Sequence, residues 1–476
     1  MKKVLFITLV LVLALGVGLI GCGGETVPPT GPDKIKVGLV RDLTGPLAFY
    51  DQMSGGPVYR AFTKMVNDDG GIYMSTYAAK KEIELDIRQF DIMSPGDLGT
   101  QTTALIDQDK VHFVWGAPGT TTIYTQASIC NAKGILLSTL EGGATDMISD
   151  PDKLPSWPYV WINLSFSDWY QVPVLYQILK EQGVSTPKAY VCYIDNEHGH
   201  EYLEVTQRIF GADNVIAKGH SFIPEATQSD MDDIVSDAKD ALGDPANPNY
   251  NIFCAWTYMP YLAYLVTSFD SFGFNPPAIA MGPGATGGAM LLYYDAATME
   301  GISGFAVANR KTVIDQPVTL TLNEMYDLVA PQATGGFPPP MTWDVWGTPI
   351  EWAGLEMWKA AVEEVGHLDV GYSAAVRDVL AGFSESNPCT TVIGDCWYYV
   401  FGNGLGGGVL DYLAMPGQIA QWQDGYPEVV GFDGINTDDW AVPPPAVGGA
   451  ATPLPKYDVT ASFIYPMTDQ WAWLAA

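Results

Sequence analysis

Short apolar runs with the spacing of strands alternate along the chain with longer segments that have the spacing of helices. Ile83, Leu85 and Ile87 recur at every second position, which is the period of a half-buried strand. Residues 58–66 repeat apolar side chains at intervals of three and four, which is the period of an amphipathic helix. Such alternation predicts a parallel sheet covered by helices on both faces. The expected strands are 34–40, 83–87, 111–115 and 135–138, and the expected helices are 58–66, 100–108 and 122–132.

The same rhythm restarts after residue 163 and predicts a second α/β unit. Its expected elements are helix 169–182, strand 189–195, a helix ending at 210, strand 251–256 and helix 261–272. A further helix is expected at 355–365, whereas Pro-rich 337–340 and 345–349 and Gly-rich 402–408 are expected to be irregular. Two units of similar size suggest a cleft between them. Open α/β sheets bind ligands beyond the carboxyl ends of their strands, so the candidate loops are 44–50, 116–122, 140–143, 196–199, 256–259 and 282–287.

The N-terminus has the pattern of an export signal. Lys2 and Lys3 precede an apolar run, which ends at Leu19-Ile20-Gly21-Cys22 and is followed by a Gly/Pro/Thr-rich stretch. This ending resembles the bacterial lipobox, in which the cysteine is acylated. We therefore expect a lipoprotein signal peptide at 1–21, acylation of Cys22, a tether at 22–33, and an extracytoplasmic location on the cell membrane. An uncleaved anchor, or a plain signal peptide with a chance cysteine, would leave the same pattern.

The negative charge of the chain and the motifs that it lacks argue against two classes of function. Cleavage after residue 21 would remove two lysines and no acids, which takes the formal charge from −31 to −33. So acidic a surface repels phosphate backbones, which argues against nucleic-acid binding. No Gly-x-Ser-x-Gly or His-Glu-x-x-His motif is present, and the Gly-x-Gly-x-x-Gly match at 402–407 lies outside a βαβ unit. We expect no enzyme activity and no cofactor.

The cysteines suggest one cross-link. Cys389 and Cys396 flank a Gly-Asp turn, and outside the cytoplasm they could form a local disulfide. Two reduced thiols are the alternative. Cys130, Cys192 and Cys254 lie in apolar contexts and are expected to be buried.

Five stretches, taken in order, resemble the type I periplasmic binding proteins of the branched-chain amino acid (Leu/Ile/Val) transporter family. The resemblance covers residues 34–432 and implies two Rossmann-like, doubly wound α/β lobes joined by a three-strand hinge. Lobe one would comprise 34–163 and 308–408, lobe two 164–307 and 409–457, and a C-terminal extension would follow at 458–476. The stretches are 36–46, 66–72, 134–139, 351–358 and 417–430.

The resemblance implies a solute-binding protein that closes on its ligand by hinge bending and is recognised by the permease of an ABC transporter. A ligand sensor or a surface interaction protein could use the same fold. The insert at 331–349 and the extension at 458–476 would then be contact surfaces, although both could equally pack on the lobes.

In the first lobe, the family's carboxylate-binding loop corresponds to 119–122. Thr120, followed by Thr121, is the candidate, because the loop opens a helix whose N–H groups and dipole favour an anion. These hydroxyls could instead serve only as an N-cap. A second loop corresponds to 140–143, where Glu141 and Gly142 replace the usual small-residue and Thr pattern.

The aromatic positions of the family's pocket correspond to Tyr50, His198 and Tyr258, with Trp256 just before the last. The acid that pairs with a ligand ammonium in amino-acid-binding members corresponds to Gly284. A buried ammonium without a counter-charge is costly, so the ligand is expected to be a carboxylate, an amide or an aromatic compound, unless Glu141 supplies the charge. His and Glu residues at 197–201 could alternatively form a metal site.

Overall fold

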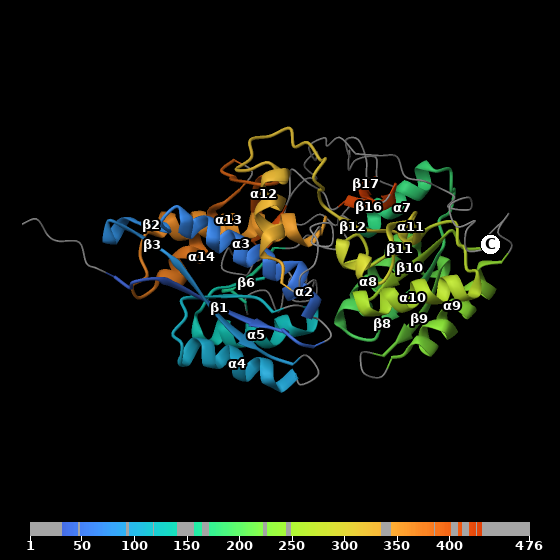
Figure 1. Cartoon of the computed structure of the whole chain (residues 1–476), viewed down its shortest axis with the longest axis horizontal. Coiled ribbons are helices and arrows are strands. Elements are labelled where there is room, and N and C mark those ends of the chain that lie inside the picture. Colours follow the sequence, from blue (N-terminus) through green and yellow to red (C-terminus); the bar gives the residue numbers. More distant parts are fainter. Residues whose placement is uncertain are drawn as a thin grey trace, which may run out of the picture.

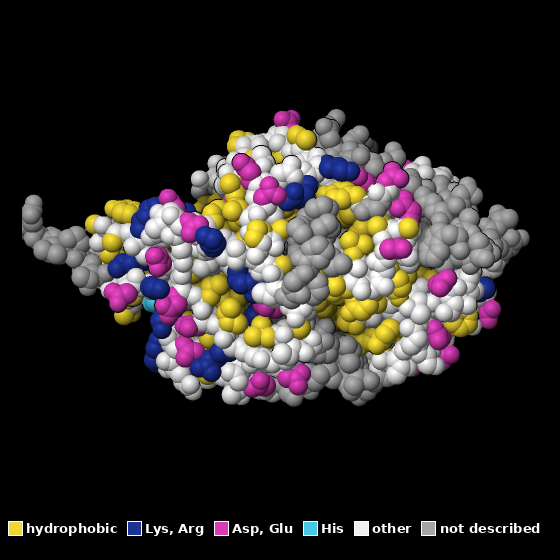
Figure 2. All heavy atoms as spheres, viewed as in Figure 1, with side chains coloured by type: hydrophobic (Ala, Val, Ile, Leu, Met, Phe, Trp, Pro, Cys, Tyr) yellow, Lys and Arg dark blue, Asp and Glu magenta, His cyan; other side chains and the backbone are white. Residues whose placement is uncertain are grey.

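The computed structural model shows two lobes, each built on its own β-sheet (Figure 1). Among the described residues, no helix is long and apolar enough to cross a membrane. Figure 2 shows acidic side chains on both lobes of the visible face, in keeping with the formal charge of −31. The structure describes residues 31–45, 48–91, 95–117, 119–139, 157–163, 171–221, 226–243, 249–334, 344–384, 386–400, 408–411, 418–424 and 426–430.

The first lobe has an eight-stranded sheet whose centre is parallel. In order across the sheet, its strands are β13 (Cys389–Thr391), β14 (Gly394–Val400), β15 (Gly408–Asp411), β7 (Val160–Ile162), β6 (Leu137–Thr139), β5 (Phe113–Trp115), β1 (Ile35–Arg41) and β4 (Ile83–Gln89). Strands β15 to β4 are parallel, and β13 and β14 run antiparallel at one edge. β1 is buried at six of its seven positions, as expected for a strand covered on both faces.

Helices cover both faces of this sheet (Figure 1). One layer contains α3 (Gly55–Asp68), α12 (Leu322–Val329), α13 (Gly347–Val365) and α14 (Tyr372–Gly382), and the other contains α4 (Pro95–Asp107) and α5 (Thr120–Lys133). The short helix α2 (Ala48–Met53) leads into α3, which is followed by a hairpin of β2 (Ile72–Met74) and β3 (Ala79–Lys81) around a 3₁₀ turn at Ser75–Tyr77.

The second lobe has a seven-stranded sheet. In order, its strands are β17 (Tyr426–Val429), β16 (Gln418–Gln423), β12 (Ser303–Ala306), β11 (Ile279–Met281), β10 (Ile252–Trp256), β8 (Ala189–Ile194) and β9 (Val215–His220). The five strands from β12 to β9 are parallel, and β16 and β17 are antiparallel. Helices α7 (Gln171–Glu181) and α8 (Glu197–Phe210) pack together and belong to one apolar cluster, whereas α9 (Gln228–Leu242) and α10 (Met259–Phe272) belong to another. Short α11 (Ala296–Met299) precedes β12, and further 3₁₀ turns lie at Ala212–Asn214, Gly288–Leu292 and Ala330–Gln332.

The chain passes between the two sheets three times. It leaves the first sheet after β7, returns from the second after β12, and leaves the first again after β15. The expected lobe boundary at residue 408 falls on the first residue of β15, which pairs in the first sheet as far as Asp411. These passages confirm the fold class of two α/β lobes.

Two of the expected boundaries are wrong. The Pro-rich segment 345–349 was expected to be irregular, but Gly347, Thr348 and Pro349 form the first turn of α13. Proline is tolerated there because N–H groups of the first turn have no partner within the helix. Helix α4 begins at Pro95 rather than at residue 100 for the same reason. The expected loops at 337–340 and 402–407 lie outside the described residues.

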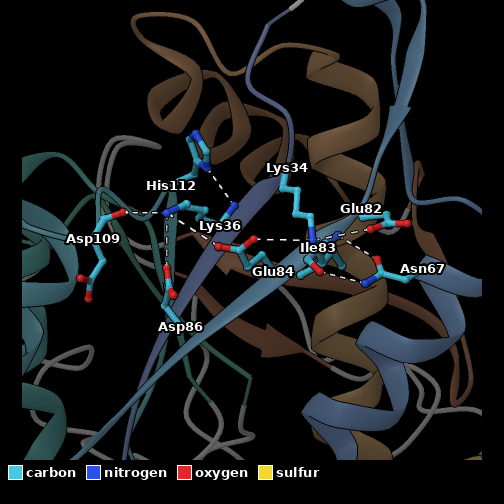
Figure 3. A network of polar contacts seen from close by, with 9 residues as sticks. All are labelled: Lys34, Lys36, Asn67, Glu82, Ile83, Glu84, Asp86, Asp109 and His112. Carbon is cyan, nitrogen blue, oxygen red and sulfur yellow. Dashed lines mark hydrogen bonds and ion pairs between the residues drawn. The ribbon is translucent and has the colours of Figure 1, made fainter.

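A network of charges fastens β1 to β4 at the outer edge of the first sheet (Figure 3). Lys36 lies 3.7 Å from Glu84 and 4.0 Å from Asp86, and Lys34 lies 3.6 Å from Glu84. These side chains are partly exposed, and such pairs contribute about 0–1 kcal/mol each. Asn67 fixes α3 on the same strand, because its amide exchanges two hydrogen bonds of 2.8 Å with the backbone of Ile83.

The structure has Cys389 and Cys396 as free thiols, and the disulfide expected between them stays a prediction. The two cysteines nevertheless lie directly opposite each other on β13 and β14. A sequence pattern can indicate such proximity, but it does not fix the oxidation state of the pair. Cys130, Cys192 and Cys254 are buried, as expected.

A buried carboxyl group joins α13 to the β13–β14 turn. Glu356 is 9% exposed, and it accepts hydrogen bonds from the Thr319 hydroxyl and from the Val392 N–H at 2.6 Å. Burial raises the pKa of Glu356 from 4.5 to about 7. The carboxyl group therefore binds its proton more tightly in the folded chain than in the unfolded chain.

This linkage predicts that Glu356 favours folding at low pH and that its contribution is lost as the pH rises from about 4.5 to about 7. In urea unfolding between pH 4.5 and pH 8, the stability of Glu356→Gln relative to wild type should therefore rise with pH, by up to about 3 kcal/mol. Glu363→Gln, which removes an exposed carboxylate from the same helix, should show no such trend. A pH-independent difference for Glu356→Gln would contradict the assignment.

Candidate functional site

The N-terminus of α5 lies where the two lobes meet. Gly119, in the left-handed region at φ 95°, turns the chain out of the loop after β5, and α5 begins at Thr120. The Thr122 hydroxyl donates to the Gly119 carbonyl oxygen at 2.6 Å. Thr120 is 3% exposed, and the N-cap residue before it is a glycine, which has no side chain to cap the helix. The N–H group of Thr120 is therefore available to a partner from outside the helix.

That partner comes from the second lobe. The Tyr258 hydroxyl oxygen, at the start of α10, is hydrogen-bonded by the backbone N–H and the side chain of Thr120 and by the Asn196 side chain. Asn196 caps α8, with its Oδ1 accepting from the Gly199 N–H at 3.2 Å. Burial raises the pKa of the Tyr258 phenol, which therefore keeps its proton.

A second contact between the lobes lies beside the first. The exposed Thr121 hydroxyl donates to Glu197 Oε2 at 3.0 Å, which joins the first turn of α5 to the first turn of α8. The lobes are thus in contact on this side of the cleft.

His198 lies beneath these contacts. Its ring stacks on Tyr258 with centroids 4.9 Å apart and an angle of 20° between the rings, and it lies 4.9 Å from the ring of Tyr202. His198 is 4% exposed, and its Nε2 has no hydrogen-bond partner among the residues that the structure describes. Burial lowers the pKa of His198 to about 3, so the ring is neutral at physiological pH and can donate or accept one further hydrogen bond.

Trp256 supports this layer and does not reach the surface of the cleft. It is fully buried, its indole N–H donates to the Thr206 hydroxyl at 2.9 Å, and its ring stacks on Phe305 at 5.4 Å. Tyr202 packs against both rings. The predicted ligand contact of Trp256 is therefore replaced by a packing role beneath His198 and Tyr202.

Gly284 has a backbone that favours glycine. Its φ is +94°, and a Cβ atom added there would lie 3.4 Å from the Cβ atom of Met259. Met259 follows Tyr258 directly, so the loop after β11 packs against the start of α10. A side chain at position 284 would be strained in this loop.

Tyr50 lies on α2 in the first lobe, 8% exposed and with its ring 4.0 Å from that of Phe49. A buried ion network holds this short helix. Asp51 accepts from Arg41 Nε and from Arg60 Nη1, both at 3.3 Å, and Arg41 is fully buried at the end of β1. Removing one partner of such a network costs several kcal/mol, so the position of Tyr50 is strongly fixed.

A cavity of about 300 Å³ opens between α5 and α8, which is the lower end of the range for small-molecule sites. The sequence predicted Thr120 in this region, placed Asn196 in a candidate loop and considered Glu197 as a metal ligand, but it missed Tyr124. The spacing of 120 and 124 on α5, and of 197, 201 and 204 on α8, is the signal that would place these side chains on facing helices. The cavity is lined by Thr120, Tyr124, Asn196, Glu197, His200, Glu201 and Glu204.

The two histidines considered as metal ligands, His198 and His200, lie in different surroundings. His198 is buried against tyrosines, whereas His200 is exposed and lies 2.7 Å from Asp195. Within the part of the chain that the structure describes, no three His, Cys, Asp or Glu residues are grouped to hold a metal ion. Glu141, Gly142 and Cys22 lie outside the described residues.

A family model and solved structures both support the fold. A family model described as "Periplasmic binding protein" matches residues 34–396. A comparison with curated proteins finds no match.

Solved structures share the fold at low identity. A solute-binding protein of an ABC transporter from R. palustris, in complex with benzoate, has a TM-score of 0.60 and 18% identity over 84% of this chain and 96% of that chain. The branched-chain amino acid binding protein LivJ of Streptococcus pneumoniae, in complex with isoleucine, has a TM-score of 0.61 and 17% identity over 84% and 100%. A leucine-binding protein of Thermotoga maritima has a TM-score of 0.60 and 14% identity over 85% and 99%. These similarities confirm the type I fold.

Proposed function

We propose a function from one premise: the chain belongs to the periplasmic binding protein family, whose model matches residues 34–396. It captures a small carboxylate-, amide- or amino-acid-like solute between its two lobes and delivers it to the permease of an ABC transporter. The observation that carries this proposal is the convergence of hydrogen-bond donors from both lobes on the Tyr258 hydroxyl.

Three hydrogen-bond donors meet at that point, within electrostatic reach of the Glu197 carboxylate. The Thr120 N–H, the Thr120 hydroxyl and the Asn196 amide all approach one phenol oxygen. A carboxylate would accept from these groups and from the Tyr258 hydroxyl as well, and bonds to an ionised acceptor are about twice as strong as neutral ones. The N-terminus of α5 adds its positive dipole end. A ligand carboxylate between Thr120 and Tyr258 would join the lobes more tightly than the direct contact does.

The glutamates of α8 that line the cavity favour a positive or hydrogen-bond-donating group. Glu197, Glu201 and Glu204 face α5 from one side of α8. Position 284 has no acid, but Glu197 lies beside Thr120 and could pair with an ammonium or amide of the ligand. A zwitterionic or amide-bearing acid therefore fits the cavity, and Tyr124 offers a face to an apolar body.

The relatives support this range of ligands without fixing one. A protein of similar fold was solved with benzoate and another with isoleucine. Both compounds carry a carboxylate, which agrees with the anion site proposed at Thr120. Anchoring through Cys22 would keep the chain beside its permease.

A screen by thermal shift tests the proposal. Protein refolded from denaturant, to remove any co-purified ligand, is incubated with aliphatic and aromatic acids, amides and amino acids. At least one class should raise Tm by mass action, since it binds the folded chain alone. If no compound of these classes raises Tm at millimolar concentration, the transport proposal is contradicted.

Substitutions test the anion site with the ligand found in that screen. Thr120→Ala and Tyr258→Phe each remove one hydroxyl group that would bond the carboxylate, and each should weaken binding roughly tenfold to a hundredfold by calorimetry. Thr125→Ala, on the same helix where it packs near Gly99, is the matched control and should bind normally. Unchanged affinity in both cleft variants would show that the carboxylate lies elsewhere.

Acylation of Cys22 is tested in the expressed full-length chain. Wild type should partition into detergent and carry lipid on its new N-terminus by mass spectrometry. Cys22→Ala should stay unprocessed and without lipid. Release of an unmodified, cleaved wild-type chain into the aqueous phase would show that residues 1–21 are a plain signal peptide.

A further inference from the structure

Cys389 and Cys396 occupy facing positions in a tight hairpin at the edge of the first sheet. The register pairs Cys389 with Cys396 and Thr391 with Gly394, which leaves Val392 and Ile393 as a two-residue turn. Residues directly opposite in an antiparallel pair have Cα atoms about 4.5–5.5 Å apart. Disulfides span about 4.4–6.8 Å between Cα atoms, so residues paired in this register fall within the range that a cross-link needs.

The two side chains also share one face of the hairpin, as opposed residues do. Both thiols lie close enough to the Tyr398 hydroxyl to raise the pKa of that phenol, although its burial is the larger cause. Cys389 is 8% exposed and Cys396 is fully buried. In the folded chain the pair is therefore shielded from reductants in solution.

We propose that Cys389 and Cys396 are joined by a disulfide when the chain folds outside the cytoplasm. The oxidant is the disulfide of a thiol–disulfide oxidoreductase. The two thiols give up two protons and two electrons, a sulfur–sulfur bond forms between Cys389 and Cys396, and the bond in the oxidoreductase breaks to yield two thiols.

The cross-link would act on the first passage between the lobes. Tyr398 lies two residues after Cys396 on β14, and its hydroxyl donates to Asn163 Oδ1 at 2.6 Å. Asn163 directly follows β7, and its amide donates to the Ser138 hydroxyl at 3.0 Å. A disulfide in the hairpin would therefore restrain β14, whose Tyr398 holds Asn163. It would thereby stiffen the point at which the chain leaves lobe one after β7.

Alkylation of the exported protein in denaturant tests the bond directly. Without reductant, three of the five cysteines that the structure describes should react, because the hairpin pair is protected. After reduction all five should react, and digestion without reduction should yield one peptide pair linked through Cys389 and Cys396. If all five react without reductant, the proposal is overturned.

A stability measurement separates the bond from general effects of the reductant. Reduction should lower the Tm of wild type, because an intact disulfide restricts the unfolded chain. The double variant Cys389→Ala, Cys396→Ala should have a Tm that reductant does not change, whereas Cys254→Ala in the second sheet should keep the wild-type response. An equal response in wild type and the double variant would contradict the proposal. If the double variant does not fold, the alkylation result decides.

Neither measurement depends on the cleft, so the disulfide proposal can fail while the solute-binding proposal stands.

Discussion

The arrangement of the site follows from the parallel cores of the two sheets. Parallel strands end at the same edge, and each must be followed by a helix that returns across a face. Helices α5, α8 and α10 therefore begin at the edges that face the cleft, directly after β5, β8 and β10. The N–H groups of their first turns have no partner within their own helices and collect there, before any particular side chain is considered.

This constraint explains why hydrogen-bond donors gather around the Tyr258 hydroxyl. Thr120 and Asn196 both lie at helix starts, and the oxygen of Tyr258 receives hydrogen bonds from both. Tyr258 itself lies at the start of α10. Helix α8 adds three carboxylates, those of Glu197, Glu201 and Glu204, to the lining of the same cavity. The proposed solute, with one acidic end and one hydrogen-bond-donating end, would bind the donors around Tyr258 and the carboxylates of α8 at the same time.

The sequence was sufficient where a pattern is local. The periodicity around Phe62 and Leu85 located α3 and β4, and the order of loops brought Thr120, His198 and Tyr258 to one place. It was insufficient where contacts depend on how the lobes meet. Glu197 and Tyr124 become neighbours only when α5 faces α8, and the full burial of Trp256 depends on the rings of Tyr202 and Phe305 around it. The start of α13 at Gly347 was missed because proline signals an irregular segment and an initial helical turn equally well.

The loop at Gly284 has a consequence for how selectivity can change. Its positive φ makes the missing acid a property of the backbone. A carboxylate added there would meet only an ordinary contact with Met259, but the positive φ would strain any side chain at this position, so the turn would have to be rebuilt. A ligand that carries an ammonium group would therefore need its counter-charge from another part of the chain. Laboratory evolution toward such a ligand would proceed more readily through the wall of α8 than through this loop.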